Sequence, residues 1–379
     1  MRCALIGTRG VPARYGGFET AVEEVGRRLA DRGHDVLVFC RTSSDDAVDD
    51  EYLGMRRIQL PALRQRSLET LSHTALSVVH PALRGVDSAV VFNAANAPLL
   101  PVLRARRVPV ATHVDGLEWQ RAKWGPIGQR YYRRAEELAV RWSDALIADA
   151  AGIARYYEAE FSAPTRQIAY GAPLISSGRS NRLVEAELTP QGYHLVVARF
   201  EPENHVLEIV RGYTASAARL PLVVVGGAPY SDEYTAEIQR AADHRVRFLG
   251  AVWDQELLDQ LYGNALTYLH GHSVGGTNPS LLRAAGAGAP VIAFDVGFNR
   301  EVVGADGRYF ATESDLMAQL EAAEADPAGF ERLGSDLRTA IARYDWDDVA
   351  SRYERLLLDL AESGPLPGTA RRWRRRRQT

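Results

Sequence analysis

Short apolar runs alternate with longer amphipathic stretches along the chain. The runs have the length of buried strands and are rich in Val, Leu, Ile and Ala. Between them, stretches of roughly 12 to 18 residues repeat apolar side chains at helical spacing, as Val22, Val25 and Leu29 do. The runs are Cys3–Ile6, Val36–Cys40, Ala89–Phe92, Val108–His113, Ala145–Ala148, Leu195–Ala198, Leu220–Val225, Val246–Leu249, Leu266–Leu269 and Pro290–Phe294. This alternation predicts an α/β fold with parallel sheets covered by helices on both faces.

Two such alternations are separated by a change in composition. Residues 172–192 contain Gly, Pro, Ser and Asn without periodicity, which is typical of a linker. A length of 379 residues is sufficient for two domains. We predict a first domain over 1–175 and a second over 185–345. An amphipathic helix over 346–365 and an Arg-rich tail over 366–379 follow.

The composition restricts the class of protein. Apolar residues form 46% of the chain and charged residues 25%, which excludes wholesale disorder. Cys3 and Cys40 lie in predicted strands, so we expect reduced core thiols and neither a disulfide nor a zinc site. The first apolar run is too short for a signal peptide, and no run approaches the ~20 residues that span a bilayer. These features predict a cytoplasmic protein.

Positive charge gathers in two stretches, although the formal net charge is −3. The tail 366–379 carries six arginines and a tryptophan, and residues 119–142 interleave Arg and Lys with Trp and Tyr. Both patterns are typical of peripheral contact with an anionic membrane. A solvated tail without a partner and a solvated helix with packed aromatic residues are the alternatives. Nucleic acid ranks below lipid because no other basic groove with interleaved aromatic residues is evident.

The loop after the first predicted strand ends in Gly16 and Gly17, at the start of a helix. The loop is too long for the dinucleotide fingerprint. Glycines at a helix N-terminus let an anion approach the backbone N–H groups closely. Because Arg9 and Arg14 lie in the same loop, we favour an anionic ligand over a simple turn.

Polar residues follow two other strands of the first domain. His113 ends one strand and Asp115 follows it, at the end where open α/β sheets bind ligands. We predict a catalytic or substrate-binding role for His113. Asn93 and Asn96 follow the preceding strand, where either sugar contacts or Asx turns explain them equally well.

Strand ends of the second domain carry further candidates. Arg199 follows one strand and can neutralise a phosphate, and Gly226-Gly227 follows the next. After Leu269 a Gly-rich loop leads to a helix that starts near Pro279, so its N–H groups and dipole favour a pyrophosphate. The candidate ligand-binding residues of this segment are His272, Gly275, Gly276, Thr277, Asn278, Ser280 and Arg283.

Four motifs carry a resemblance to a known family. They read GTRGVPARYGGFET at 7–20, HVDGLEW at 113–119, GHSVGGTNPS at 271–280 and FNRE at 298–301. Together they resemble the rhamnosyltransferase-like branch of glycosyltransferase family 4. The similarity extends over nearly the whole chain up to about residue 360.

The resemblance implies a GT-B fold, in which two Rossmann-like domains face a central cleft and the last helix packs back on the first domain. It implies a retaining transfer from a nucleotide sugar without a metal or other cofactor. His113 would lie beside the donor sugar and Arg199 would hold the diphosphate as the catalytic residues. The donor-binding residues would be Gly16, Gly17, Asp115, Gly226, Gly227, His272, Gly275, Gly276, Thr277, Asn278, Ser280 and Arg283.

The chain departs from the wider family at three positions. Gly275 and Arg283 stand where most members carry two glutamates, and Asn204 stands where they carry a lysine. Arg283 cannot accept hydrogen bonds from ribose hydroxyls, although it can supply the charge that Asn204 lacks. A donor with a deoxyribose loses fewer hydrogen bonds when Arg283 stands in place of the glutamate. This difference favours a dTDP sugar over a UDP sugar.

These observations predict a glycosyltransferase, with rhamnose as a candidate sugar. The acceptor is predicted to be a glycan or a polyprenyl-linked glycan in cell-surface polysaccharide synthesis. A non-catalytic nucleotide-sugar-binding protein and a sugar-nucleotide epimerase on the same fold remain alternatives. An NAD-dependent oxidoreductase ranks last, because the dinucleotide fingerprint is missing.

Overall fold

The structure is a computed structural model that describes residues 1–13, 16–42, 49–63, 65, 68–114, 116–121, 124–175, 179–227 and 232–364. Two compact units emerge: Met1–Tyr170 with the chain from Trp346 onward, and Gly171–Asp345. Three predicted features lie outside the described residues, namely Asp115, Arg14 and the Arg-rich tail.

Within the described residues, the first unit contains an eight-stranded sheet in the order β3-β4-β2-β1-β5-β6-β7-β8. Its pairs are parallel except β3 with β4. The strands are β1 (Arg2–Ile6), β2 (Asp35–Arg41), β3 (Glu51–Tyr52), β4 (Met55–Leu60), β5 (Ser88–Phe92), β6 (Val110–His113), β7 (Ala145–Ala148) and β8 (Arg166–Gln167). Leu5 lies in register with Val38 of β2 and Val90 of β5, and all three are buried.

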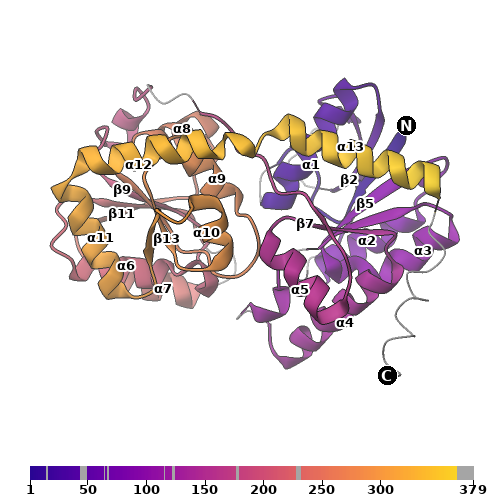
Figure 1. The fold of residues 1–379 in the computed structure, drawn as a ribbon, viewed down its shortest axis with the longest axis horizontal. Helices are drawn as coiled ribbons and strands as arrows, with labels where there is room; N and C mark the ends of the chain where they lie inside the picture. Colours follow the sequence, from indigo (N-terminus) through magenta and orange to yellow (C-terminus); the bar gives the residue numbers. More distant parts are fainter. Residues whose placement is uncertain are drawn as a thin grey trace. The chain divides into compact units, whose positions relative to one another are not determined.

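Helices cover both faces of this sheet (Figure 1). They are α1 (Gly17–Asp31), α2 (Glu69–Val79), α3 (Leu100–Ala105), α4 (Pro126–Trp142), α5 (Ala151–Phe161) and α13 (Trp346–Ser363). The right-handed crossovers put α1 on one face and α2, α3 and α4 on the other. Val22, Val25 and Leu29 form the buried stripe of α1, as their spacing predicts.

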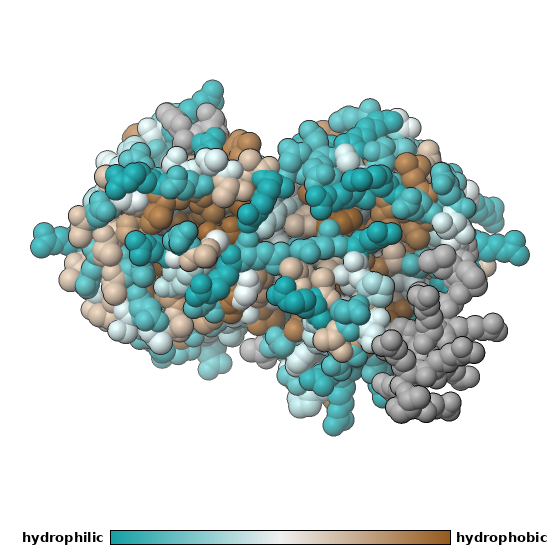
Figure 2. Space-filling model, in the orientation of Figure 1, coloured by the Kyte–Doolittle hydropathy of each residue, from teal (hydrophilic) through white to brown (hydrophobic). Residues whose placement is uncertain are grey.

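The last helix, α13, packs against α1 and β5. The Ser88 hydroxyl donates to the Leu357 carbonyl at 2.9 Å, and Arg32 forms an ion pair with Glu354 at 2.6 Å. Its opposite side is solvated, and hydrophilic residues predominate over α13 on the face shown in Figure 2. This amphipathic helix therefore completes the first unit, although it is remote in sequence.

The described part of the second unit contains a six-stranded parallel sheet in the order β11-β10-β9-β12-β13-β14. Its strands are β9 (His194–Val197), β10 (Leu222–Val225), β11 (Val246–Gly250), β12 (Thr267–His270), β13 (Val291–Phe294) and β14 (Arg308–Phe310). Its helices are α6 (Val206–Ala215), α7 (Asp232–Ala241), α8 (Gln255–Gly263), α9 (Pro279–Gly286), α10 (Gly297–Val303), α11 (Glu313–Ala325) and α12 (Pro327–Ala340). Four buried residues belong to the core between this sheet and the helices α6 and α11, namely Val196, Ile209, Val224 and Leu316.

The segment expected to link the domains belongs to the second unit instead. The Ala172 N–H donates to the Tyr344 carbonyl at 2.6 Å, and the Ile175 N–H donates to the Gly286 carbonyl at 3.1 Å. Leu183 is fully buried. The predicted boundary at 175 therefore shifts to Tyr170/Gly171, because backbone hydrogen bonds that the sequence pattern does not reveal fix this segment.

Candidate functional site

Each sheet has a point where the strand order reverses, and the candidate residues follow the strands at these two points or the strands next to them. In the second unit it lies between β9 and β12, and in the first between β1 and β5. Ligands of open α/β sheets bind outside the carboxyl ends of the strands at such a point. The loops that leave β9 and β12 therefore form the candidate site of the second unit.

The loop after β12 leads into the N-terminus of α9, as predicted. Asn278 is the N-cap, and its side-chain oxygen accepts from the Ser280 N–H at 2.9 Å, with Pro279 in the first turn. Gly275 has a φ of +144°, a conformation that L side chains rarely adopt. A Cβ at this glycine would lie 3.0 Å from Nε2 of His272, which explains why the loop has no side chain there.

Ser280 and Thr277 are integrated into the structure of this loop. The Tyr268 hydroxyl donates to Ser280 Oγ at 3.1 Å, and Ser280 Oγ donates to Asn278 Oδ1 at 2.8 Å. Thr277 is buried. The first turn of α9 is therefore held rigidly, with the positive end of the helix dipole at the carboxyl edge of the sheet. Pro279 has no N–H and the Ser280 N–H is bonded to Asn278, so the dipole is what this turn offers an anion.

Arg199 lies two residues after the end of β9 and is half-buried. The Asn204 side chain donates to the Arg199 carbonyl at 2.8 Å and accepts from Nδ1 of His272 at 2.7 Å. Asn204 therefore does not leave a gap where a lysine would stand, because its amide joins the loop after β9 to the loop after β12.

Arg283 has a partner that the sequence did not predict. Its Nε donates to Oδ1 of Asp259, on α8, at 2.8 Å. The ion pair with this carboxylate offsets part of the guanidinium charge, and the expectation that Arg283 compensates for the missing charge at Asn204 stays a prediction. Asp259 and Arg283 are 24 residues apart in sequence, so only the packing of α8 against α9 brings them together.

The two glycines after β10 have different surroundings. Gly226 has a φ of +138°, and a Cβ there would overlap the Ala198 carbonyl oxygen. At Gly227 a Cβ would meet no heavy atom of the described structure within 4 Å. The first glycine is required by the fold, whereas the second leaves open space at the carboxyl edge of the sheet.

In the first unit, His113 ends β6 and is completely buried. Its ring lies 5.1 Å from Phe18, 5.5 Å from Phe92 and 5.9 Å from Tyr170 between ring centroids. Burial lowers the pKa of His113 to about 3, so its imidazole is neutral at neutral pH. The sequence does not reveal this enclosure by aromatic rings. Contact of His113 with a donor stays a prediction.

Gly16 and Gly17 start α1, but neither supplies an unusual turn. Gly16 is the N-cap with an extended φ of −164°. Among the described residues of this loop, positive φ angles occur at Gly7 and Gly10 instead. A Cβ at Gly7 would lie 2.5 Å from the Phe92 carbonyl oxygen, so the approach of β1 to β5 depends on this glycine, which the sequence pattern does not single out.

The asparagines after β5 serve the local backbone. Asn93 has a φ of +71°, and its side-chain oxygen accepts from the Ala95 N–H at 2.8 Å, which is an Asx turn. The buried Asn96 side chain donates to the Phe92 carbonyl at 2.8 Å. Of the two interpretations, the structure favours turn chemistry over sugar contacts.

The aromatic residues of the basic aromatic stretch, 119–142, make contacts within the first unit. The Tyr131 hydroxyl donates to the Ala95 carbonyl at 2.7 Å, and Trp124 Nε1 donates to Glu118 at 3.2 Å. The Arg133 guanidinium lies 4.1 Å from the ring centroid of Trp119. The aromatic half of the predicted membrane face is therefore half-buried by these contacts, while the arginines of α4 remain exposed.

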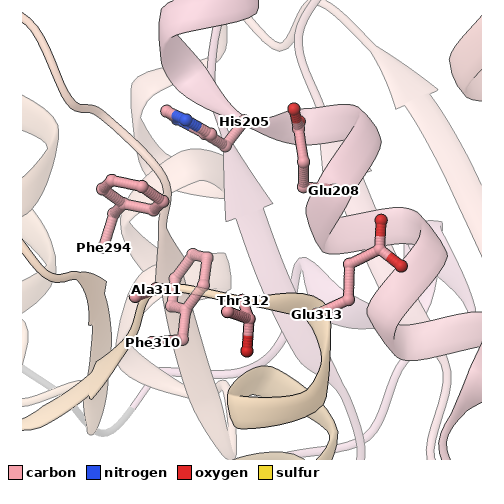
Figure 3. A pocket seen from close by; sticks show the side chains of 7 residues that line it. All are labelled: His205, Glu208, Phe294, Phe310, Ala311, Thr312 and Glu313. Carbon is pink, nitrogen blue, oxygen red and sulfur yellow. The ribbon is translucent and has the colours of Figure 1, made fainter.

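A cavity of about 310 Å³ lies at the carboxyl edge of the second sheet, beside the loop after β12. Its lining residues are His205, Glu208, Phe294, Phe310, Ala311, Thr312 and Glu313 (Figure 3). The His205 and Phe294 rings stack with centroids 4.0 Å apart. His205 Nδ1 donates to the Gly271 carbonyl at 2.8 Å. His205 therefore lines this cavity and also holds the start of the loop after β12, which belongs to the candidate site.

None of the helices in the described ranges combines the length and the apolar character that a bilayer-spanning segment needs.

Two glycosyltransferase domain families match the chain, one in each of its two units. A glycosyl transferase 4-like domain matches residues 16–171, and a domain of the glycosyl transferases group 1 matches residues 192–325. The O-antigen chain mannosyltransferase B of Escherichia coli is 23% identical over 175 residues. That match spans 45% of this chain and 42% of the length of the mannosyltransferase.

Solved structures share the fold over nearly the whole chain. Sucrose-phosphate synthase from Thermosynechococcus elongatus superposes with a TM-score of 0.81 at 21% identity, covering 96% of this chain and 99% of that one. HepE from Anabaena, solved with UDP-glucose, gives a TM-score of 0.78 at 17% identity, covering 95% of this chain and 100% of that one. Because both family domains match in order on two parallel-sheet α/β units, the chain belongs to glycosyltransferase family 4 and has the GT-B fold.

Proposed function

We propose that this glycosyltransferase moves a sugar, with rhamnose as the candidate, from a dTDP- or UDP-linked donor with retention and without a metal. The proposed acceptor is a glycan or a lipid-linked glycan of a cell-surface polysaccharide. The observation that carries the donor proposal is the loop after β12, which leads into the rigid first turn of α9 at the strand-order reversal. Its His272 is joined through Asn204 to the backbone of Arg199. HepE binds UDP-glucose and the E. coli relative is an O-antigen mannosyltransferase, which supports donor and acceptor class.

In the proposed reaction, the bond between the anomeric carbon and the diphosphate oxygen breaks while the acceptor oxygen attacks the same face. The departing phosphate oxygen takes the acceptor's proton, so the step needs no external base. Arg199 and the positive end of the α9 dipole stabilise the negative charge that develops on the leaving diphosphate. His113, neutral because of its burial, contributes shape and a dipole but no charge.

A donor-dependent thermal shift tests this proposal. A ligand that binds only the folded protein stabilises it by about 2.7 kcal/mol at 100 times its Kd. We expect the Tm to rise with dTDP or UDP sugars, and sugar to reach a glycan acceptor in a transfer assay. Binding without transfer or hydrolysis would indicate the non-catalytic protein, and conversion of the donor sugar without acceptor would indicate the epimerase.

We also propose peripheral contact of α4 with an anionic membrane, which would bring the enzyme to a lipid-linked acceptor. Four arginines of α4 are exposed, namely Arg130, Arg133, Arg134 and Arg141, and Ile127 near the start of the helix is 84% exposed. Basic side chains near an anionic surface contribute about 1 kcal/mol each.

Vesicle flotation tests this contact. We expect the protein to float with phosphatidylglycerol vesicles and not with phosphatidylcholine vesicles. The double variant Arg130→Glu/Arg134→Glu should lose at least ten-fold in partitioning. A charge-matched control, Arg211→Glu/Arg332→Glu on exposed positions of the second unit, should float like the wild type. Equal flotation of both double variants would refute the role of α4.

A further inference from the structure

The side chain of Asn204 has defined donor and acceptor ends. The Arg199 carbonyl can only accept, so the Asn204 NH₂ group must face it, at 2.8 Å. The amide oxygen therefore faces His272, and Nδ1 of His272 must carry the proton in the 2.7 Å bond. One buried amide thus sets the backbone position of Arg199 and also the tautomer and ring orientation of His272.

Neighbouring contacts fasten the same two loops. The N–H and the hydroxyl of Ser273 donate to the Glu203 carbonyl at 2.9 and 3.1 Å. His205 donates to the Gly271 carbonyl, and a Cβ at Gly271 would overlap the Asn204 carbonyl oxygen. Residues 203–205 and 271–273 therefore lie against each other, with no room for a side chain at Gly271.

We infer that Asn204 is a positioning residue of the transferase, joining the loop that carries Arg199 to the loop that opens α9. The inference rests on the proposed function, because these loops are the proposed contacts of the leaving diphosphate. Asn299 holds the far side of the same loop, by donating to the His272 carbonyl at 2.9 Å. A lysine at position 204 would supply charge, but it could not accept the His272 proton.

Three substitutions separate the parts of this role. Asn204→Leu removes both hydrogen bonds and should lower kcat/KM about 10- to 100-fold, mostly in kcat, because misplaced groups no longer meet the transition state. Asn204→Asp keeps the acceptor for His272 and should retain more activity than leucine. Asn204→Lys adds a cation yet should be as impaired as leucine.

Asn264 provides a matched control. It is also a buried asparagine of the second unit, and its amide donates to the Arg179 and Gln260 carbonyls at 3.0 and 2.9 Å. It lies before β12, at the amino edge of the sheet, away from the candidate site. Asn264→Leu should lower the Tm as Asn204→Leu does, but leave kcat/KM within about two-fold.

Hydrogen exchange of the free protein gives a readout that does not depend on activity. Peptides that cover 199–205 and 271–278 should exchange at least ten-fold faster in Asn204→Leu, and at the wild-type rate in Asn264→Leu. Unchanged exchange of both peptides in Asn204→Leu overturns the inference, as does wild-type kcat in that variant. Absence of donor binding and turnover in the wild type overturns the proposed function instead, and the exchange result still decides whether Asn204 joins the loops.

Discussion

Alanine in place of Arg199 is expected to lower kcat/KM for sugar transfer by about 100- to 1000-fold, with the Tm little changed. Arg199 follows β9 at the reversal of strand order, where its guanidinium can meet the charge that develops on the diphosphate. Its backbone carbonyl stays fixed by Asn204 in the variant, so the loss should reflect the missing charge and not a displaced loop. Steady-state kinetics with the donor that gives the largest thermal shift measures the effect.

Two controls make this result specific. Arg199→Lys keeps the charge but not the planar fork, and should recover only part of the rate. Arg219→Ala removes an exposed arginine just before β10, at the opposite edge of the same sheet, and should leave kcat/KM unchanged. Turnover of Arg199→Ala within three-fold of the wild type would contradict the assignment of Arg199.

The second large effect is expected at Gly226. Gly226→Ala should reduce the free energy of unfolding by more than about 3 kcal/mol. The energetic cost of the strained φ angle adds to the cost of the overlap between the new Cβ and the backbone. The glycine has a φ of +138°, and the new Cβ would overlap the Ala198 carbonyl oxygen, which cannot move without disrupting the end of β9. Urea denaturation followed by circular dichroism measures the loss.

Gly227→Ala is the matched control, since its Cβ would meet no described heavy atom within 4 Å. We expect its free energy of unfolding to stay within about 0.5 kcal/mol of the wild type. A lower donor affinity at unchanged stability would support the predicted approach of the donor to Gly227. Equal stability of the two alanine variants would refute the distinction between these neighbouring glycines.

The predicted strands were confirmed where the chain is apolar on both faces of a sheet. All ten apolar runs contain or overlap a strand, from β1 to β13. The sequence did not predict β4 (Met55–Leu60), in which buried Met55 alternates with exposed Arg56 near the sheet edge. It also missed the short strands β3, β8 and β14, whose few residues carry too weak a pattern.

The candidate site was predicted less completely than the fold. The start of α9 follows from local chemistry, because Asn278 and Pro279 are a cap and a first-turn residue. The partners of Asn204 and Arg283 do not, since His272 and Asp259 lie 68 and 24 residues away along the chain. Distant partners of this kind leave no periodic trace in the sequence.

The sequence by itself determined the alternation of strands and helices, the two α/β units and the loops at which ligands are expected. These features follow from local hydrophobic spacing and from the conformational limits of Gly, Pro and Asn, which act over a few residues. Only the tertiary structure decided that His113 is enclosed by rings, that Asp259 pairs with Arg283 and that Asn204 joins two loops. Burial and pairing depend on which distant segments pack together, and a single sequence does not specify those neighbours.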